Sequence, residues 1–176
     1  MKNKYVYDKG GQIHFLTFSC YKRRKLLSRD RCKAVVLGVL AQELRKQHGK
    51  CLGFVIMPNH VHALLWFPQD DTLSAFVQIW KQKTSVELAK LFHKWMPEYG
   101  RSIIDDPVWQ RRFYDFNVIS DKNFLTKLDY MHNNPVKAGF VSASIGWRYS
   151  SARHYELGSS IGVPIASLDD LLRKDL

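Results

Sequence analysis

The chain has 176 residues, 45% hydrophobic and 24% charged, which is enough for one folded domain with a buried core. Lysine and arginine number 27 against 16 aspartates and glutamates, so the net charge of +11 indicates a polyanionic partner, nucleic acid before an anionic membrane. No apolar run approaches the roughly 20 residues of a membrane-spanning helix, and the N-terminus lacks the apolar segment of a signal peptide. The three cysteines have no Cys-x-x-Cys spacing, which favours reduced thiols in a cytosolic protein.

The first predicted element is a central strand over residues 12–20, which is apolar on both faces. A basic loop follows it, with the cations Lys22, Arg23 and Arg24. A charge run is usually solvated surface, but the adjacent aromatic residue and the end of a core strand make contact with phosphates an equal alternative. Apolar residues on one face of 29–50 predict an amphipathic helix, which Ser28 can cap and residues 48–49 can end.

Two apolar runs, 51–57 and 60–67, flank a Pro-Asn pair and predict a strand, a tight turn and a second strand. Side chains alternate along a strand, so His60 and His62 project from the same face. A pair of imidazoles on a stiff strand suits a divalent cation. Two partly buried structural histidines would have the same pattern.

A second long amphipathic helix is predicted over residues 72–95. Its middle carries two lysines that are either solvated or in contact with a nucleic-acid backbone, Lys81 and Lys83. Residues 96–107 contain two prolines and a glycine and are predicted to form a loop. The next stretch mixes aromatic residues with arginines, which is typical of base stacking and phosphate pairing but also of a plain edge strand that continues to residue 119. Its candidate contacts are Trp109, Arg111 and Arg112.

These elements follow the order strand, helix, strand, strand, helix, strand, with a further helix after the last strand. The order predicts an α+β fold of the ferredoxin-like, split βαβ kind, in which two long helices cover one face of an antiparallel sheet. No linker or repeat divides the chain, so we predict one domain over residues 1–156. Residues 157–176 form a tail with a helix over 167–176.

The third helix is predicted over residues 122–134, behind an N-cap at 120–121, and Pro135 ends it because a proline disfavours helical geometry at the preceding residue. At ~100° per residue, Tyr130 lies on the polar face, opposite the apolar stripe. Asn134 lies next to it, because residues four apart are neighbours on a helix surface. A surface tyrosine beside a helix-ending asparagine is the alternative interpretation. The cations expected to contact nucleic acid here are Lys122, Lys127 and Lys137.

Two imidazoles and an amide oxygen make a three-ligand face on a divalent cation and leave positions for phosphate oxygens. A phenol, with an unperturbed pKa of about 10, is a weak nucleophile at neutral pH. It attacks phosphorus only where a cation stabilises it or withdraws charge from its target. The histidine pair, the helix-borne tyrosine and the positive charge therefore predict a tyrosine nuclease that cleaves phosphodiesters.

Three motifs resemble those of one family. Residues 57–62 (MPNHVH) resemble the His-hydrophobe-His, or HUH, motif of single-tyrosine transposases. Residues 128–139 (LDYMHNNPVKAG) resemble the tyrosine helix of the REP-associated branch, and residues 147–155 (WRYSSARHY) its tail. The resemblance covers residues 5–155, with the three motifs in the expected order.

The resemblance implies a ferredoxin-like endonuclease and transposase that cuts and rejoins single-stranded DNA beside palindromic hairpins, in the cytoplasm at the nucleoid. It implies that His60 and His62 bind Mg²⁺ or Mn²⁺, with Asn134 at the position of the third ligand. Tyr130 is then the nucleophile, forming a 5′-phosphotyrosyl link and releasing a 3′-hydroxyl. His132 is a rival ligand by residue type, but it lies ~200° round the helix from Tyr130.

The sequence departs from the family pattern at Phe116, where a histidine is expected after Asp115, and this departure puts catalytic activity in question. Tyr114 is a second candidate nucleophile, but the residue four positions on, Val118, is apolar. Two other functions stay open: a domesticated relative that binds hairpin DNA or structured RNA without cutting it, and a replication initiator or relaxase-type nuclease. A monomer and a dimer, with the tyrosine acting in cis or in trans, also stay open.

Overall fold

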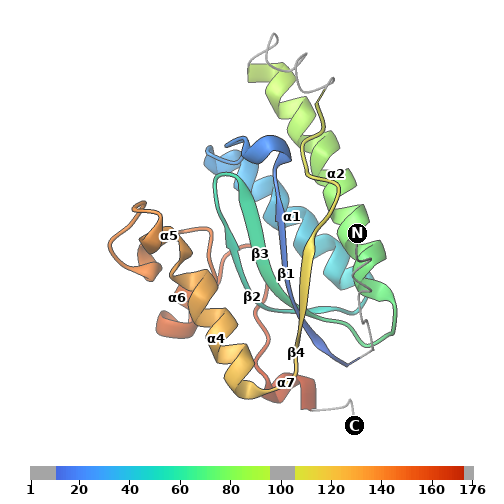
Figure 1. The fold of residues 1–176 in the computed structure, drawn as a ribbon, viewed down its shortest axis with the longest axis vertical. Helices are drawn as coiled ribbons and strands as arrows, with labels where there is room; N and C mark the ends of the chain where they lie inside the picture. Colours follow the sequence, from blue (N-terminus) through green and yellow to red (C-terminus); the bar gives the residue numbers. More distant parts are fainter. Residues whose placement is uncertain (1–10, 96–105, 173–176) are drawn as a thin grey trace.

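The computed structural model describes residues 11–95 and 106–172. Four strands and two long helices form the body of the protein, and shorter helices follow the last strand (Figure 1). In chain order the elements are β1 (Ile13–Ser19), η1 (Tyr21–Arg23), α1 (Asp30–Lys46), β2 (Lys50–Ile56), β3 (His60–Trp66), α2 (Thr72–Trp95), β4 (Tyr114–Val118), α4 (Asp121–His132), α5 (Asn134–Lys137), η2 (Ser144–Gly146), α6 (Ala152–Leu157) and α7 (Asp169–Leu172).

The strands form one antiparallel sheet in the order β2-β3-β1-β4. Each strand that follows a long helix is separated from the strand before that helix by one antiparallel neighbour, which is the split βαβ arrangement. The predicted ferredoxin-like fold is confirmed. In the register of the sheet, Thr17 of β1 lies between His62 of β3 and Tyr114 of β4.

The two faces of the sheet bury different helices (Figure 1). One face packs against α1 and α2, whose apolar stripes form the larger core, and the Trp80 indole of α2 donates to the Val36 carbonyl of α1 at 2.9 Å. The other face packs against α4 through a smaller core that includes Phe15, Leu128 and Met131. The site described below lies on this second face. Of the helices that the structure describes, none is long and apolar enough to cross a membrane.

Three element ends differ from the sequence-based prediction. Ser28 does not cap α1: its hydroxyl donates to the Lys25 carbonyl, and the residue at the N-cap is Arg29, whose side chain makes no capping bond. Strand β4 begins only at Tyr114, so most of the arginine-rich stretch lies outside the strand. In the predicted loop 96–107, residues 96–105 lie outside the described residues.

The third difference is at the end of α4. This helix ends at His132, and Asn134 begins the short helix α5 instead of closing α4. Pro135 is tolerated there because the first turn of a helix has no intrahelical acceptor for its missing N–H. The predicted N-cap of α4 is present, since the Ser120 side chain accepts from the Asn123 amide.

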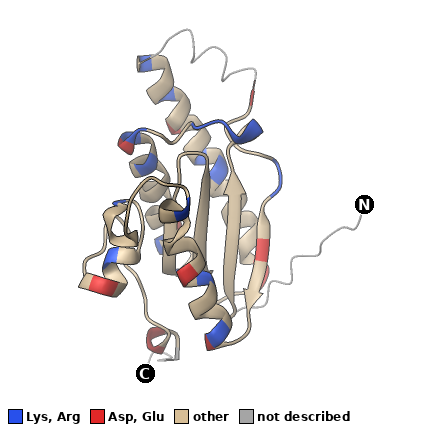
Figure 2. Cartoon of the chain, turned by 60° about the vertical axis from the view of Figure 1, so that its left-hand side comes forward, with Lys and Arg blue, Asp and Glu red and all other residues tan. Residues whose placement is uncertain are grey.

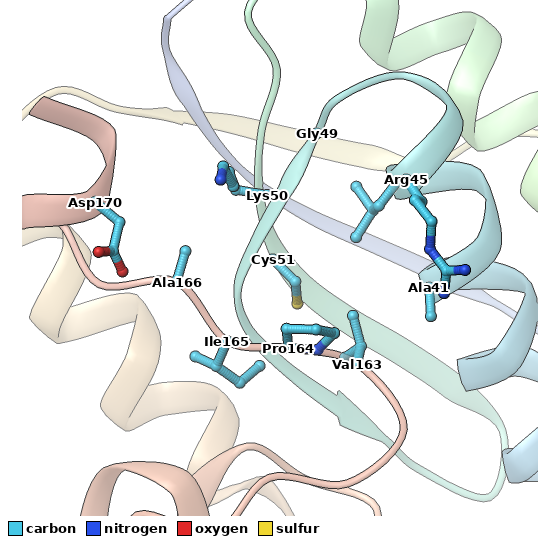
Figure 3. A pocket seen from close by; sticks show the side chains of 11 residues that line it. Ala41, Arg45, Gly49, Lys50, Cys51, Val163, Pro164, Ile165, Ala166 and Asp170 are labelled. Atoms are coloured by element: carbon cyan, nitrogen blue, oxygen red, sulfur yellow. The ribbon is translucent and has the colours of Figure 1, made fainter. Parts of the chain in front are cut away.

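The tail covers the free edge of β2. Ile165 forms a parallel bridge with Cys51, and the Ala166 amide donates to the Cys51 carbonyl at 2.8 Å. Between this segment, the end of α1 and the start of β2 lies a pocket of about 520 Å³ (Figure 3). The pocket is at the opposite end of the β2–β3 hairpin from the histidine pair and contains none of the predicted site residues. The tail helix is α7, and residues 173–176 of its predicted span lie outside the described residues.

Candidate active site

The histidine pair stands at the start of β3, directly after the hairpin turn. The Met57 amide donates to the His60 carbonyl at 2.9 Å, which closes the turn. His60 and His62 project toward α4, with ring centroids 4.8 Å apart, and His62 is only 4% exposed. The predicted shared face of the pair is therefore present, and it is the face that carries the tyrosine helix.

Neighbouring side chains fix the orientation of both imidazoles. The Nδ1 atom of His62 is 2.6 Å from the Thr17 hydroxyl, and the Nδ1 atom of His60 is 2.7 Å from the side-chain oxygen of Asn59. An amide oxygen only accepts, so His60 carries its proton on Nδ1. The same tautomer of His62 donates to Thr17 and leaves Nε2 to accept from the Asn134 amide nitrogen, 3.2 Å away. Each ring thus carries its lone pair on Nε2, and that of His62 faces the Asn134 side chain.

Burial keeps the pair uncharged. It lowers the pKa of His60 to about 4 and that of His62 to about 3, and for His62 the adjacent His60 and the cations Arg23 and Lys127 act in the same direction. A neutral imidazole is the form that binds a metal ion. At neutral pH no proton has to leave either ring before a cation can bind.

Tyr130 meets the histidine pair from α4. The apolar stripe of that helix, including Leu128 and Met131, packs on the sheet, and Tyr130 lies at the border between the sheet and solvent with 44% of its surface exposed. Its ring centroid is 5.5 Å from that of His62, and the Lys137 ammonium lies 5.7 Å from the same ring. The structure therefore brings the phenol and the imidazoles together on one side of the sheet.

The donor set fits a divalent cation. Two neutral imidazoles present Nε2 lone pairs, and the Asn134 side chain donates to that of His62 and also interacts with His60. A half-turn of that amide places its oxygen where its nitrogen now lies. Within residues 11–95 and 106–172 there is no cluster of three His, Cys, Asp or Glu side chains that could hold a metal, so the donors gathered at this point are two imidazoles and one amide.

Two of the predicted nucleic-acid contacts lie close to the histidines. The Arg23 guanidinium donates to the Ser19 hydroxyl at 3.0 Å, and Ser19 pairs with His60 in the sheet. The Lys127 ammonium lies 4.4 Å from the ring centroid of Phe116 and 5.1 Å from that of Phe15. Lys and Arg also mark the segment before β4 and the surface of α4 (Figure 2). The exposed cations there are Arg111, Arg112 and Lys122.

Other predicted contacts are engaged within the chain. Lys22 and Arg24 both pair with Asp106, and Arg24 also donates to the Pro107 carbonyl at 2.6 Å. Lys81 of α2 donates to the backbone carbonyl of Gln110 and so holds the segment before β4 against α2. Lys83 pairs with buried Glu43 at 2.7 Å, on the face away from the histidines.

The prediction for Trp109 needs correction. Its ring is 4% exposed, packs edge-on against Phe18 and donates to the Thr84 hydroxyl at 2.9 Å. A ring buried in the core cannot stack on a base. The alternation of aromatic residues and arginines was misleading because the aromatic side chain points inward and the arginines outward.

His132 lies away from the site. Its Nε2 atom is 2.7 Å from the Ser151 hydroxyl, and Ser151 in turn accepts from the Phe54 amide of β2. His132 therefore ties the tyrosine helix to the edge strand and the tail.

Sequence analysis did not identify Thr17 and Asn59 as residues of the site. Asn59 stands beside the motif and was a possible choice, whereas nothing local distinguishes Thr17.

A ferredoxin-like sheet with a His-x-His strand facing a tyrosine-bearing helix is the arrangement of the single-tyrosine transposases. The family model of IS200-like transposases matches residues 9–134, and the chain belongs to this family. It is therefore a member of a family of DNA-processing enzymes.

Two relatives support the resemblance to the REP-associated branch. The chain is 35% identical over 100 residues to a Haemophilus influenzae protein assigned as a REP-associated tyrosine transposase, a match over 54% of each chain. It is 26% identical over 147 residues to the REP-associated tyrosine transposase of Escherichia coli, covering 82% of this chain and 78% of that protein. The chain thus spans about half the length of the first relative and most of the second.

A solved structure of a REP-associated tyrosine transposase bound to a REP hairpin shares the fold, with a TM-score of 0.70 and 20% identity. The match covers 96% of this chain and 93% of that one. This match shows the shared fold, and the family model confirms the resemblance to the single-tyrosine transposases identified from the three motifs.

Proposed function

We propose that this protein is a metal-dependent tyrosine transposase that cleaves and rejoins single-stranded DNA beside palindromic hairpins. The observation that carries the proposal is the position of the Tyr130 ring, 5.5 Å from His62 and on the same side of the sheet as Asn134. The family contributes the reaction class, and the hairpin bound by the related REP-associated transposase supports the same substrate class here. A DNA substrate places the reaction at the nucleoid, in the cytoplasm.

His60, His62 and Asn134 would hold Mg²⁺ or Mn²⁺, and a bound cation would withdraw charge from the scissile phosphate. The Tyr130 hydroxyl gives its proton to solvent as its oxygen forms a bond to phosphorus. The bond between phosphorus and the 3′-oxygen breaks, and that oxygen takes up a proton. The products are a 5′-phosphotyrosyl link and a free 3′-hydroxyl. Attack by a 3′-hydroxyl on the link reverses these steps and rejoins a strand.

All four side chains come from one chain. Tyr130 reaches His62 without a contribution from a second copy, which supports a tyrosine that acts in cis. Arg23, Lys127 and Lys137 surround the same point with positive charge, as a polyanionic strand requires.

The test is formation of a covalent adduct. Wild-type protein incubated with a hairpin that carries a single-stranded flank and Mn²⁺ is expected to give a denaturant-resistant protein–DNA band, which chelator removes. Tyr130→Phe is expected to abolish the band and keep hairpin binding within about twofold, because only the nucleophilic oxygen is lost. Tyr155→Phe is the matched control, since Tyr155 has similar exposure but its hydroxyl donates to the Leu52 carbonyl. An adduct that persists in Tyr130→Phe refutes the assignment.

A second candidate function is hairpin binding without cleavage, and the residue that favours it is Phe116 in place of the expected histidine. That function predicts salt-sensitive binding of hairpin DNA or structured RNA that a chelator does not change. It also predicts no adduct in the wild-type protein. The adduct assay therefore separates the two functions, and family membership favours both over a replication initiator or relaxase.

A further inference from the structure

Strand β4 carries two aromatic residues on the sheet face that holds the histidine pair. Tyr114 pairs with Thr17, which pairs with His62 on its other side, so Tyr114 and His62 project from the same face. Phe116 pairs with Phe15 and projects from that face as well. Neither aromatic residue of β4 has a role in the reaction proposed above.

The two rings have different surroundings. Tyr114 is 43% exposed, although it lies on the face of the sheet that elsewhere packs against α4. Phe116 is half-buried, and the Lys127 ammonium lies 4.4 Å from its ring centroid, within the range of a cation–π interaction. One ring is thus presented to solvent, and the other holds a cation next to it.

The position of Tyr114 argues against its role as a second nucleophile. Two strand spacings separate it from His62, which is on the order of 10 Å, whereas the Tyr130 ring centroid is 5.5 Å from His62. A phosphate at the histidine pair would therefore lie closer to Tyr130 than to Tyr114. The distance is suited to a neighbouring nucleotide of the same strand.

The charges around Tyr114 match a nucleic-acid strand. Arg111 and Arg112 are exposed three and two residues before it in the chain, and Arg23 lies at the adjacent end of β1 beside Ser19. Exposed aromatic rings between cations bind single strands because every base has a face to stack and every linkage carries a negative charge. Duplex DNA does not offer its base faces, so a surface of this kind is suited to a single strand.

We propose that Tyr114 stacks a base of the single strand next to the cleavage site, and that Phe116 holds Lys127 against the adjoining phosphate. The two residues are about 7 Å apart along β4, so together they form a subsite for one nucleotide. The subsite discriminates weakly among bases, because stacking does not read their edges. The identity of the bound strand rests on the proposed function, but the test of the subsite needs no cleavage.

The test measures binding of a fluorescein-labelled oligothymidylate by anisotropy, with chelator present and Tyr130→Phe as the parent protein. Tyr114→Ala is expected to weaken binding about tenfold, within the range measured for loss of one stacking ring. Tyr114→Phe is expected to bind within about twofold of the parent, because the ring and not the hydroxyl makes the contact. Ile119→Ala, which removes an 81% exposed apolar side chain just beyond β4, is the control and is expected to have no effect.

A strand of the same length with abasic sites separates stacking from charge. It is expected to bind the parent and Tyr114→Ala equally, since it has no base to stack. Phe116→Leu is expected to weaken binding of both strands and to reduce the salt dependence, because Lys127 loses its support. Thermal unfolding of each variant confirms that it is folded before binding is compared.

Two results overturn the inference: equal binding of oligothymidylate by Tyr114→Ala and the parent, or a loss in Tyr114→Phe as large as in Tyr114→Ala. The adduct assay is independent of this outcome. Absence of the Tyr130 adduct with a persisting Tyr114 effect refutes the proposed cleavage and leaves the stacking subsite in place. An adduct without a Tyr114 effect refutes the subsite alone.

Discussion

Thr17 and Asn59 determine which nitrogen each histidine presents. Both hold an Nδ1 atom, at 2.6 and 2.7 Å, and this arrangement turns the Nε2 atom of His62 toward Asn134, which also interacts with His60. Partners of this kind fix the tautomer and the ring orientation of metal-binding histidines. Thr17 and Asn59 therefore hold both rings in the orientation that a cation between them and Asn134 would need.

At the same scale, Asn134→Asp tests the third ligand. A carboxylate is a charged, harder ligand for Mg²⁺ and Mn²⁺ than an amide, so we expect Mn²⁺ to bind about tenfold more tightly, and Asn134→Ala to weaken binding by a similar factor. Isothermal titration of Mn²⁺ into protein without DNA measures both. Equal Mn²⁺ affinity in all three proteins would show that Asn134 is not a ligand.

At the scale of elements, the distance between α4 and β2 depends on Gly53. A methyl group at this position would overlap the Met131 Cε atom and lie 2.9 Å from the Leu128 Cδ1 atom. Met131 follows Tyr130 directly, so the depth at which α4 packs also sets the position of the phenol. The absence of a side chain at Gly53 therefore belongs to the construction of the site, although it lies on a different strand from the histidines.

Gly53→Val is expected to lower the free energy of unfolding by about 1–3 kcal/mol, as overpacking of a filled core does. It is also expected to slow adduct formation, because valine displaces the Met131 and Leu128 side chains that pack α4, and with it Tyr130, on the sheet. Denaturant unfolding and single-turnover adduct formation measure the two effects. Gly38→Ala in α1 is the control, since a methyl group there meets nothing within 4 Å and alanine favours a helix. Wild-type stability in Gly53→Val would contradict this account of the packing.

For the molecule as a whole, three histidines are held neutral on the face of α4. Burial lowers the pKa of His132 to about 4, beside about 4 for His60 and about 3 for His62. Their ordinary value is 6.5. As the pH falls below that value, the unfolded chain takes up protons that the folded chain does not, so protonation favours unfolding.

The free energy of unfolding is therefore unaffected by protonation of these histidines above about pH 6.5. It decreases as the pH falls from there toward the pKa values of the folded state. We expect the denaturation midpoint of metal-free protein to drop between about pH 7 and about pH 5, with a loss on the order of 1 kcal/mol for each fully buried histidine. The double variant His60→Asn, His62→Asn is expected to show a shallower drop. A midpoint independent of pH over this interval would exclude the mechanism.

The sequence by itself determined the order of the elements, the antiparallel sheet and the face on which each key side chain lies. Apolar residues repeat with the period of a strand or a helix, so the pattern of one segment shows which of its faces is buried. That is why His60 and His62 could be placed on one face of a strand, and Tyr130 and Asn134 side by side on the predicted third helix. Burial of Trp109 and the turn at Asn134 escaped prediction because a short aromatic-arginine stretch and an X-Pro pair each permit more than one local structure.

Only the tertiary structure decided which of these faces meet. Thr17 lies beside His62, 45 residues on in the chain, because of the register between β1 and β3. Lys81 and Lys83 are engaged by the chain itself, whereas Arg23 and Lys127 lie at the histidine pair. Register and packing depth result from contacts between distant segments, such as the fit of Met131 against Gly53. No periodicity within one segment contains that information, and for this reason the site had to be read from the folded chain.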